Sequence, residues 1–292
     1  MQQFVNVTLT GLISGSVYAA FALALVLIWR STRIVNFAQG SMAAATSFIA
    51  LALIQAGQSY WLALVVALAA GFVLGAVVER VVIRPVEGGP ELNAVIVTLG
   101  LFIAIQALIA IVFGSSFDSF PAPFGLRGFE VGGTTIALTP NSVYVLVAVL
   151  VTMVALVALF RFTRVGLAMR ASAFGQEVAR LLGVRVGRML TLGWGLAAVV
   201  GSLSGLLIAG GGLVWPAYMD ALIVFGFVAA VLGGLDSPVG AVVGGLTIGL
   251  ALAYVSAYAD PALVNLAALA ILMVVLLVRP GGLFASSTAR RA

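Results

Sequence analysis

The sequence contains no cysteine, no histidine and no lysine, and arginine supplies all fourteen of its basic residues. Without cysteine there is no disulfide and no thiol nucleophile, and zinc or haem sites built on cysteine or histidine are excluded. Without lysine there is no phosphate-binding loop of the GK[ST] type. The chain therefore cannot be its own ATPase of that class.

Charge is also scarce, because only 8% of the 292 residues are charged and 63% are hydrophobic. Ordinary soluble domains have roughly 25% charged residues, and a soluble fold could not cover so much apolar surface. Several apolar runs approach or exceed about 18 residues, which is typical of spanning helices rather than of a membrane barrel. The sequence predicts an all-α integral membrane protein, a polytopic bundle of about eight or nine transmembrane helices.

The apolar segments follow one another in a regular order. The predicted spans cover residues 9–29, a segment that begins near 37, 60–78, 92–113, 142–160, a segment from after 188 to about 208, a segment after 220 that ends at 233–234, 238–257 and a segment from 261 that ends at 279. The seventh is short enough to be a re-entrant or broken helix, and merging two short segments would lower the count. Ser237 and Asp260, each followed by proline, are expected to cap the last two helices, and Asp220 is expected to cap the seventh. Residues 1–285 are expected to form one transmembrane domain, with a flexible tail at 286–292.

The distribution of arginine predicts the orientation. No basic residue precedes the first apolar run, so this run is expected to be a retained span rather than a signal peptide. Arg30 and Arg33 follow it directly, and positive charge favours the cytoplasmic side. With the N-terminus outside and the C-terminus in the cytoplasm, thirteen of the fourteen arginines lie in cytoplasmic segments and only Arg127 lies outside.

Two long polar interruptions separate the spans. Residues 114–141, rich in Gly and Pro, are predicted to form an extracytoplasmic loop with a small hairpin around Gly132-Gly133. Residues 161–188 contain six arginines and a helical apolar stripe within an arc roughly 100° wide: Leu167, Ala171, Phe174, Val178, Leu181 and Leu182. Such a helix could lie on anionic lipid headgroups or dock into a groove of a cytosolic partner, and the pattern alone leaves both open.

The spans offer little reactive chemistry. Glu79 and Asp236 lie nearest to membrane depth and are expected to be interfacial caps or ion pairs, whereas pumps and gradient-driven transporters usually keep ionisable groups inside the bilayer. An intramembrane hydrolase would need a nucleophile with a general base, for which no His, Lys or buried carboxylate is predicted. The sequence therefore argues against an enzyme and against coupling to an ion gradient.

Small and polar residues predict how the bundle is built. Four pairs of glycines spaced four apart are expected to let helices pack closely: Gly11 and Gly15, Gly71 and Gly75, Gly201 and Gly205, and Gly240 and Gly244. Five polar side chains could line a pathway through the bundle or could equally bond neighbouring helices: Asn36, Gln39, Thr98, Gln106 and Asn265.

Several stretches, in order along nearly the whole chain, resemble a single family. They are GLISGSVYAAFALALVLIWRSTRIVNFAQGSMA, ERVVIRPVEGG with VIVTLGL, TRVGLAMRASAFGQEVARLLGV, GGLDSPVGAVVGG and RPGGLF. In the third, Glu177, Ala179 and Gly183 keep the E-x-A-x-x-x-G spacing of ABC importer permeases. The chain resembles the branched-chain amino-acid ABC importer permeases, specifically the LivH-type subunit. It departs from them at Gln39-Gly40-Ser41, where the family often has His-Gly-Glu, and at Val178, which replaces the central alanine.

The resemblance implies a permease of the bacterial plasma membrane that is not an enzyme and forms the pathway for branched-chain or related hydrophobic amino acids. The chain itself would hold no cofactor or metal, because ATP and Mg would be bound by two cytoplasmic ABC ATPase subunits. Residues 161–188 would be the segment that couples to them, through Arg170, Phe174, Glu177, Val178, Ala179, Arg180, Leu182 and Gly183. Further implied partners are a second homologous permease, an extracytoplasmic substrate-binding protein and membrane lipid, but no nucleic acid.

Three alternatives remain open at this point. The substrate could be urea, a short amide or another small polar solute, which related permeases carry. The chain could instead be an ATP-independent facilitator. The two permeases could form a heterodimer, as is usual in the family, or a homodimer.

Overall fold

The structure is a computed structural model that describes residues 1–131 and 133–284, so the predicted tail at 286–292 lies outside the described residues. The described part contains seven helices that are long and apolar enough to cross a membrane, and two shorter apolar helices. This confirms the prediction of an all-α membrane protein.

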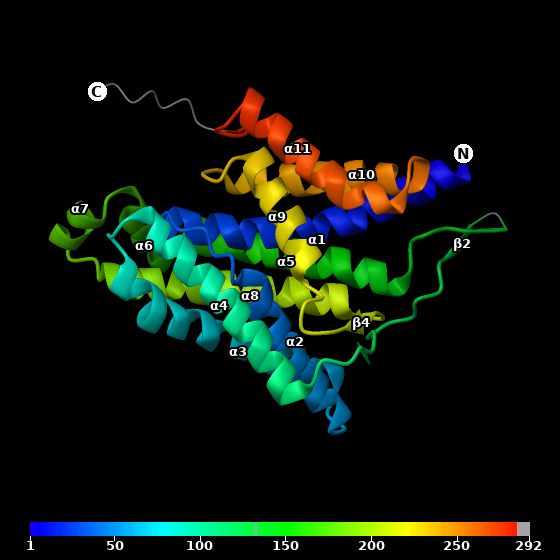
Figure 1. The fold of residues 1–292 in the computed structure, drawn as a ribbon, viewed down its shortest axis with the longest axis horizontal. Coiled ribbons are helices and arrows are strands. Elements are labelled where there is room, and N and C mark those ends of the chain that lie inside the picture. The colour runs from blue at the N-terminus through cyan, green and yellow to red at the C-terminus, as the bar shows by residue number, and fades with distance from the viewer. Residues whose placement is uncertain (132, 285–292) are drawn as a thin grey trace.

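The helices run in the order expected from the apolar segments (Figure 1). They are α1 (Gln2–Thr32), α2 (Gln39–Gln55), α3 (Tyr60–Val77), α4 (Glu91–Phe113), α5 (Pro140–Phe162), α6 (Arg164–Phe174), α7 (Gln176–Leu181), α8 (Val186–Ala209), α9 (Asp220–Gly233), α10 (Pro238–Tyr258) and α11 (Val264–Val278). A π-helical stretch, η1 (Val78–Ile83), and a 3₁₀ turn, η2 (Arg84–Val86), extend α3, and a 3₁₀ turn, η3 (Pro261–Leu263), precedes α11.

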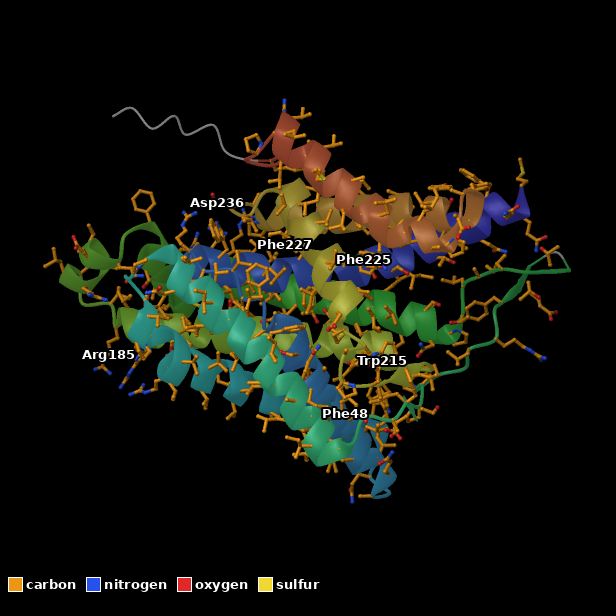
Figure 2. The ribbon with its side chains drawn as sticks, in the orientation of Figure 1. Phe48, Arg185, Trp215, Phe225, Phe227 and Asp236 are labelled. Atoms are coloured by element: carbon orange, nitrogen blue, oxygen red, sulfur yellow. The ribbon has the colours of Figure 1, made fainter. Side chains whose placement is uncertain are left out.

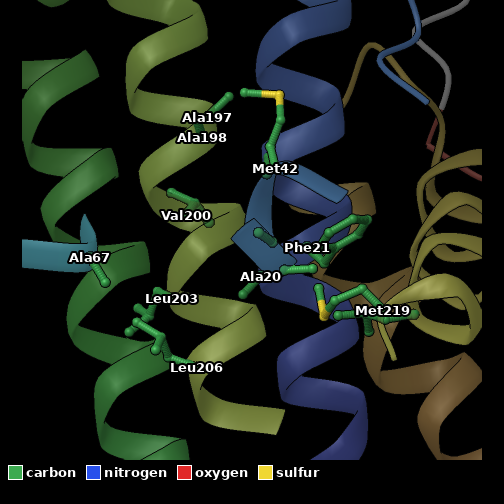
Figure 3. Close-up of a cluster of buried hydrophobic side chains, with 14 of the residues drawn as sticks. Ala20, Phe21, Met42, Ala67, Ala197, Ala198, Val200, Leu203, Leu206 and Met219 are labelled. Atoms are coloured by element: carbon green, nitrogen blue, oxygen red, sulfur yellow. The ribbon is translucent and has the colours of Figure 1, made fainter. Parts of the chain in front are cut away.

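Two helices, α1 and α8, form the centre of the bundle. Both are apolar on all sides and largely buried, as expected of a helix that is surrounded by others. Figure 3 shows part of this core, in which side chains of α1, α2, α3 and α8 pack together with Met219. By contrast, α4, α5 and α11 expose most of their apolar surface, as lipid-facing or partner-facing helices do.

Glycine sets the closest helix contacts, as the spacing predicted. A Cβ added at Gly15 would meet the backbone of Gly245 and Leu246 in α10 at about 3.0 Å. A Cβ at Gly75 would lie 2.6 Å from the carbonyl oxygen of Trp194 in α8. All four predicted pairs lie against a neighbouring element, although at Gly71, Gly201 and Gly205 a Cβ would meet chiefly side chains rather than backbone.

The two short helices begin inside the bundle. At 1.5 Å per residue, α2 is about 25 Å long and α9 about 21 Å, less than the roughly 30 Å of a hydrocarbon core. Gln39, the first residue of α2, bonds Ala197, which lies midway along α8. The segment 33–38 therefore folds back into the bundle before α2 starts, and the start of α9 lies beside it, because a Cβ at Gly40 would lie 3.5 Å from Met219 Cβ.

The predicted cap of α10 is confirmed, whereas the cap of α9 is not. Asp260 caps the 3₁₀ turn η3 rather than α11 itself, whose N-cap residue is Leu263. Ser237 Oγ accepts a hydrogen bond from the Gly240 amide at 3.0 Å, and Asp260 Oδ1 accepts one from Ala262 at 2.8 Å. The N-cap residue of α9 is Met219, and Asp220 is its first helical residue. The prediction for Asp220 was wrong because its side chain turns away from its own helix to Gln106 of α4.

The ends of the bundle differ in composition. At one end, Arg33 pairs with Asp236 at 2.6 Å, and Figure 2 shows Asp236 and Arg185 on this side of the molecule. The segments 30–33, 80–84, 161–188 and 236 meet here. This end holds the segments predicted to be cytoplasmic.

The opposite end contains the segments predicted to be outside. The expected hairpin is present as β2 (Glu130–Val131) paired with β3 (Thr134–Thr135), and Ala137 donates to Asn6 Oδ1 of α1 at 2.9 Å. A second pair, β1 (Asp118–Ser119) with β4 (Leu213–Val214), joins the loop after α4 to the loop after α8. This pairing was not predicted from the sequence, because the two strands are short and nearly a hundred positions apart.

Candidate functional site

The arginine-rich segment folds as two short helices rather than as one. Thr163 Oγ1 accepts a hydrogen bond from Gly166 at 2.9 Å and starts α6. The helix ends at Gly175, whose extended backbone (φ −167°, ψ 104°) also begins α7. The prediction of a single continuous helix from the apolar stripe was therefore wrong. The helix breaks at Gly175, because glycine stabilises a helix less than the other residues of this run do.

One face of this helix pair packs on the bundle. Met169, Ser172 and Ala179 are buried, and Ala179 contacts Val186 and Leu190 of α8. Gln176 donates to Glu87 Oε1 at 3.2 Å. These contacts fix α6 and α7 against the ends of α3 and α8.

The other face is apolar and has no cover within the described residues. Its exposed apolar face consists of Leu167, Phe174, Val178, Leu181 and Leu182, with side chains between 60% and 97% exposed. Arg170, Glu177 and Arg180 are exposed beside it, and Gly183 turns the chain back with φ 81°. Of the eight predicted coupling residues, Ala179 alone is buried and supports the segment from below. An exposed apolar patch of this kind typically marks an interaction site.

A second candidate site lies where the two short helices begin. Asn36 Oδ1 accepts the Ala38 amide at 3.0 Å, its Nδ2 donates to Gln39 Oε1 at 3.0 Å, and Gln39 Nε2 donates to Ala197 O at 2.9 Å. Both side chains are about 1% exposed. The two side chains join the turn between α1 and α2 to α8. Their hydrogen bonds satisfy polar groups that would otherwise be costly to bury.

The starts of α2 and α9 approach closely at this depth. A side chain at Gly40 would overlap Ile223, and its Cβ would lie 3.5 Å from Met219 Cβ. The amino end of a helix carries a partial positive charge, so the region where these two helices begin has a positive potential inside the bundle. Thr98, also buried, lies near the same turn, with its hydroxyl 3.4 Å from Val35 O and 3.1 Å from Val95 O.

Gln106, the fourth predicted pathway residue, bonds the start of α9 rather than the turn before α2. Its Nε2 donates to Asp220 Oδ1 at 2.7 Å, which joins α4 to the start of α9. Asp220 was missed as a site residue, since it was expected only to cap its helix. The length of the apolar segment after Asp220 could have indicated this. A segment too short to span a membrane can begin below the membrane surface, and its first residue then lies at that depth. Asn265, by comparison, is exposed on α11.

The other two acidic residues near the membrane have arginine partners, as predicted, but the expectation that no carboxylate is buried was wrong for Glu79. Glu79 is fully buried, and its carboxylate accepts bonds from Arg84 at 2.9 Å and Thr191 at 2.7 Å. Arg84 also donates to Gly187 O at 2.7 Å. Asp236 pairs with Arg33 in a solvent-exposed contact. Among the described residues there is no group of three or more acidic side chains that could hold a metal ion.

Comparison with known proteins places this geometry in context. Residues 7–277 match the family described as "Branched-chain amino acid transport system / permease component". The chain is 31% identical to the high-affinity branched-chain amino acid transport system permease protein LivH of Escherichia coli K12, over 97% of this chain and 94% of the relative. It is 29% identical to the permease protein BraD of Pseudomonas aeruginosa, over 97% and 95% respectively.

A solved structure shows a looser likeness. The chain aligns with PsaBC from Streptococcus pneumoniae in complex with Fab at a TM-score of 0.46 and 13% identity, covering 96% of this chain and 93% of the other. A likeness of that size supports no argument about function.

Proposed function

Since the chain belongs to the branched-chain amino acid transport permease family, we propose that it is the membrane-spanning permease subunit of an ABC importer for branched-chain amino acids. It is a multi-pass protein of the inner membrane. Its relatives are transport permease proteins and not enzymes. In this proposal ATP and Mg are bound by two separate ATPase subunits, and a second homologous permease and an extracytoplasmic binding protein complete the importer.

The observation that carries the ATPase contact is the exposed apolar face of α6 and α7. Phe174 is 97% exposed although it is flanked by a well-packed inner face. An amphipathic helix with an uncovered apolar side suits a groove on a partner protein. We assign Phe174, Val178 and Leu182 to the contact with an ATPase, and Arg170, Glu177 and Arg180 to its polar rim.

For the pathway we assign the region where α2 and α9 begin. Gln106 and Asp220 are its most open polar groups, since both are only partly buried. An amino acid is a zwitterion, so a site for it needs an acceptor for the ammonium group and a positive potential for the carboxylate. Asp220 can accept further hydrogen bonds besides that of Gln106, and the two helix starts supply the potential. Asn36, Gln39 and Thr98 hold the α2 start in place from behind.

The first experiment is purification of the tagged chain from its native membrane in mild detergent, with identification of what accompanies it. Two P-loop ATPases and a second permease are expected to copurify. The complex is then reconstituted in proteoliposomes with its binding protein, where it should take up labelled leucine only when ATP is present. If the permease is a homodimer, the purified complex will contain no second permease sequence.

The competing functions predict other results. Competition by urea or short amides, with no effect of leucine, would assign the importer to small polar solutes. Leucine uptake by the chain alone without ATP would assign it to facilitators and overturn the ABC proposal.

A further inference from the structure

A groove at the arginine-rich end of the bundle shares only Arg170 with the residues assigned to the transport function. It has a volume of about 410 Å³ and lies between α1, α5, α6 and α10. Leu23 and Leu27 of α1, Phe160 of α5 and Val242 of α10 are among the side chains that give it an almost entirely apolar lining.

Three arginines from three different helices line the same groove. Arg30 lies in the last turn of α1, Arg161 in the last turn of α5, and Arg170 near the end of α6. The two ion pairs among the described residues are Arg33 with Asp236 and Arg84 with Glu79, so none of the three has a carboxylate partner there. Asp236 acts on Arg30 from a distance but is already paired with Arg33. The groove therefore combines an apolar lining with an excess of positive charge.

From this arrangement we infer that the groove binds one anionic phospholipid. The phosphate would be held by Arg30, Arg161 and Arg170, since guanidinium groups match phosphate oxygens in pairs. An acyl chain would lie along Leu27 and Leu23, which extend about 10 Å from Arg30 toward the centre of the bundle. Basic pockets between helices at the cytoplasmic surface bind anionic headgroups in this way. A small soluble anion would leave the apolar lining uncovered, and an uncharged lipid would leave the arginines without a partner.

The position of the groove gives the lipid a structural consequence. Arg170, Met169 and Ala173 of α6 line the groove beside the ends of α1 and α5. A bound headgroup would place a negative charge among three like charges, reduce their mutual repulsion and bridge these helices. The lipid would thus hold α6 against the membrane-embedded bundle, independently of which solute the protein carries.

Native mass spectrometry of the detergent-purified protein, with any subunits that accompany it, tests this inference. The probes are phosphatidylglycerol and phosphatidylcholine of the same acyl chains. The wild-type protein is expected to retain one phosphatidylglycerol in preference to phosphatidylcholine. The triple variant Arg30→Gln, Arg161→Gln, Arg170→Gln should lose about tenfold or more of that preference.

The matched control removes the same charge at the same end but outside the groove, as Arg80→Gln, Arg185→Gln, Arg188→Gln. This control should keep the preference for phosphatidylglycerol. An equal loss of that preference in both triple variants would show that general surface charge causes it, and would contradict a site in the groove. A second variant, Val242→Trp, fills the groove and leaves its arginines in place. It should also lose the bound lipid.

Two further outcomes contradict the inference. Unchanged phosphatidylglycerol binding by Val242→Trp would show that the acyl chain does not enter the groove. Displacement of the lipid by millimolar glycerol phosphate would show that the arginines serve a free phosphate compound instead. Should the arginine triple variant fail to elute as a folded species, Val242→Trp and the glycerol phosphate competition still decide the question.

Discussion

At the scale of single residues, Asp220 stands out because its carboxylate lies within the bundle without a basic partner, among the described residues, to stabilise its charge. Carboxylates within membrane-spanning regions are costly and mark substrate or ion pathways. Glu79 and Asp236 each have an arginine partner, whereas Asp220 bonds the neutral amide of Gln106.

We expect Asp220→Asn to lower leucine uptake by at least about tenfold, because an amide replaces the charge that a substrate ammonium would meet. The measurement is initial uptake into proteoliposomes at matched protein content. Glu130→Gln, which makes the same chemical change on the exposed hairpin, should leave uptake unchanged. Wild-type uptake by Asp220→Asn would remove this residue from the pathway.

The buried pair of Glu79 and Arg84 gives a test of stability. Arg84→Met leaves the buried carboxylate of Glu79 without its charged partner, and such losses cost about 3 kcal/mol. The double variant Glu79→Leu, Arg84→Met should regain part of that free energy of unfolding, because no unpaired charge remains. Denaturant unfolding in detergent measures both.

The exposed pair at the same end provides the control. Arg33→Met removes a contact whose side chains are 60% and 56% exposed, and it should cost less than about 1 kcal/mol. Equal effects of Arg33→Met and Arg84→Met would show that burial of Glu79 does not make its pair important.

At the scale of elements, the sequence predicted where most helices lie along the chain better than where they break or how deep in the bundle they begin. The ends of α4, α5 and α10 lie within about two residues of the predicted spans, since a continuous apolar run bounded by Pro, Gly or Arg leaves few alternatives. The break at Gly175 and the depth of α2 and α9 were not predictable in the same way. Helical periodicity continues across a break, and depth depends on contacts such as that of Gln39 with Ala197.

The helix pair α6 and α7 gives a test of coupling. Glu177→Arg should abolish uptake and the copurification of ATPase subunits, because it reverses the charge on the rim of the exposed apolar face. Phe174→Ala should weaken both, since it removes the most exposed apolar side chain of that face. Uptake and subunit recovery are measured at matched membrane expression. Glu130→Arg, at the opposite end, serves as the control, and normal transport by Glu177→Arg would contradict the coupling role.

The contact between α1 and α10 gives a test of packing. Gly249→Val should prevent folding or lower the unfolding temperature by many degrees, because a Cβ at this position overlaps the backbone of Gly15. Gly100→Val is the matched control, since nothing lies within 4 Å of a Cβ on this exposed position of α4. Comparable thermal stability of the two variants, measured by fluorescence of the folded fraction in detergent, would contradict the close packing.

At the scale of the whole molecule, the arginine count and the contacts support the same division into two ends. The count assigns segments to sides of the membrane, and the contacts between Arg33 and Asp236 and between Asn6 and Ala137 join segments assigned to the same side. The sequence could predict this division because charge in loops is a local property. It could not predict the phospholipid groove, since Arg30, Arg161 and Arg170 come together only after three helices have packed.

The division also predicts the orientation, which can be measured because the chain has no cysteine of its own. Arg185→Cys and Ser119→Cys introduce single thiols at opposite ends, and both positions are exposed. If the arginine-rich end is cytoplasmic, a membrane-impermeant maleimide added to intact cells should label Ser119→Cys, and Arg185→Cys should react only after the membrane is opened. The reverse order of labelling would place α6 and α7 outside, where no ATPase could reach them, and would contradict the orientation and the coupling role together.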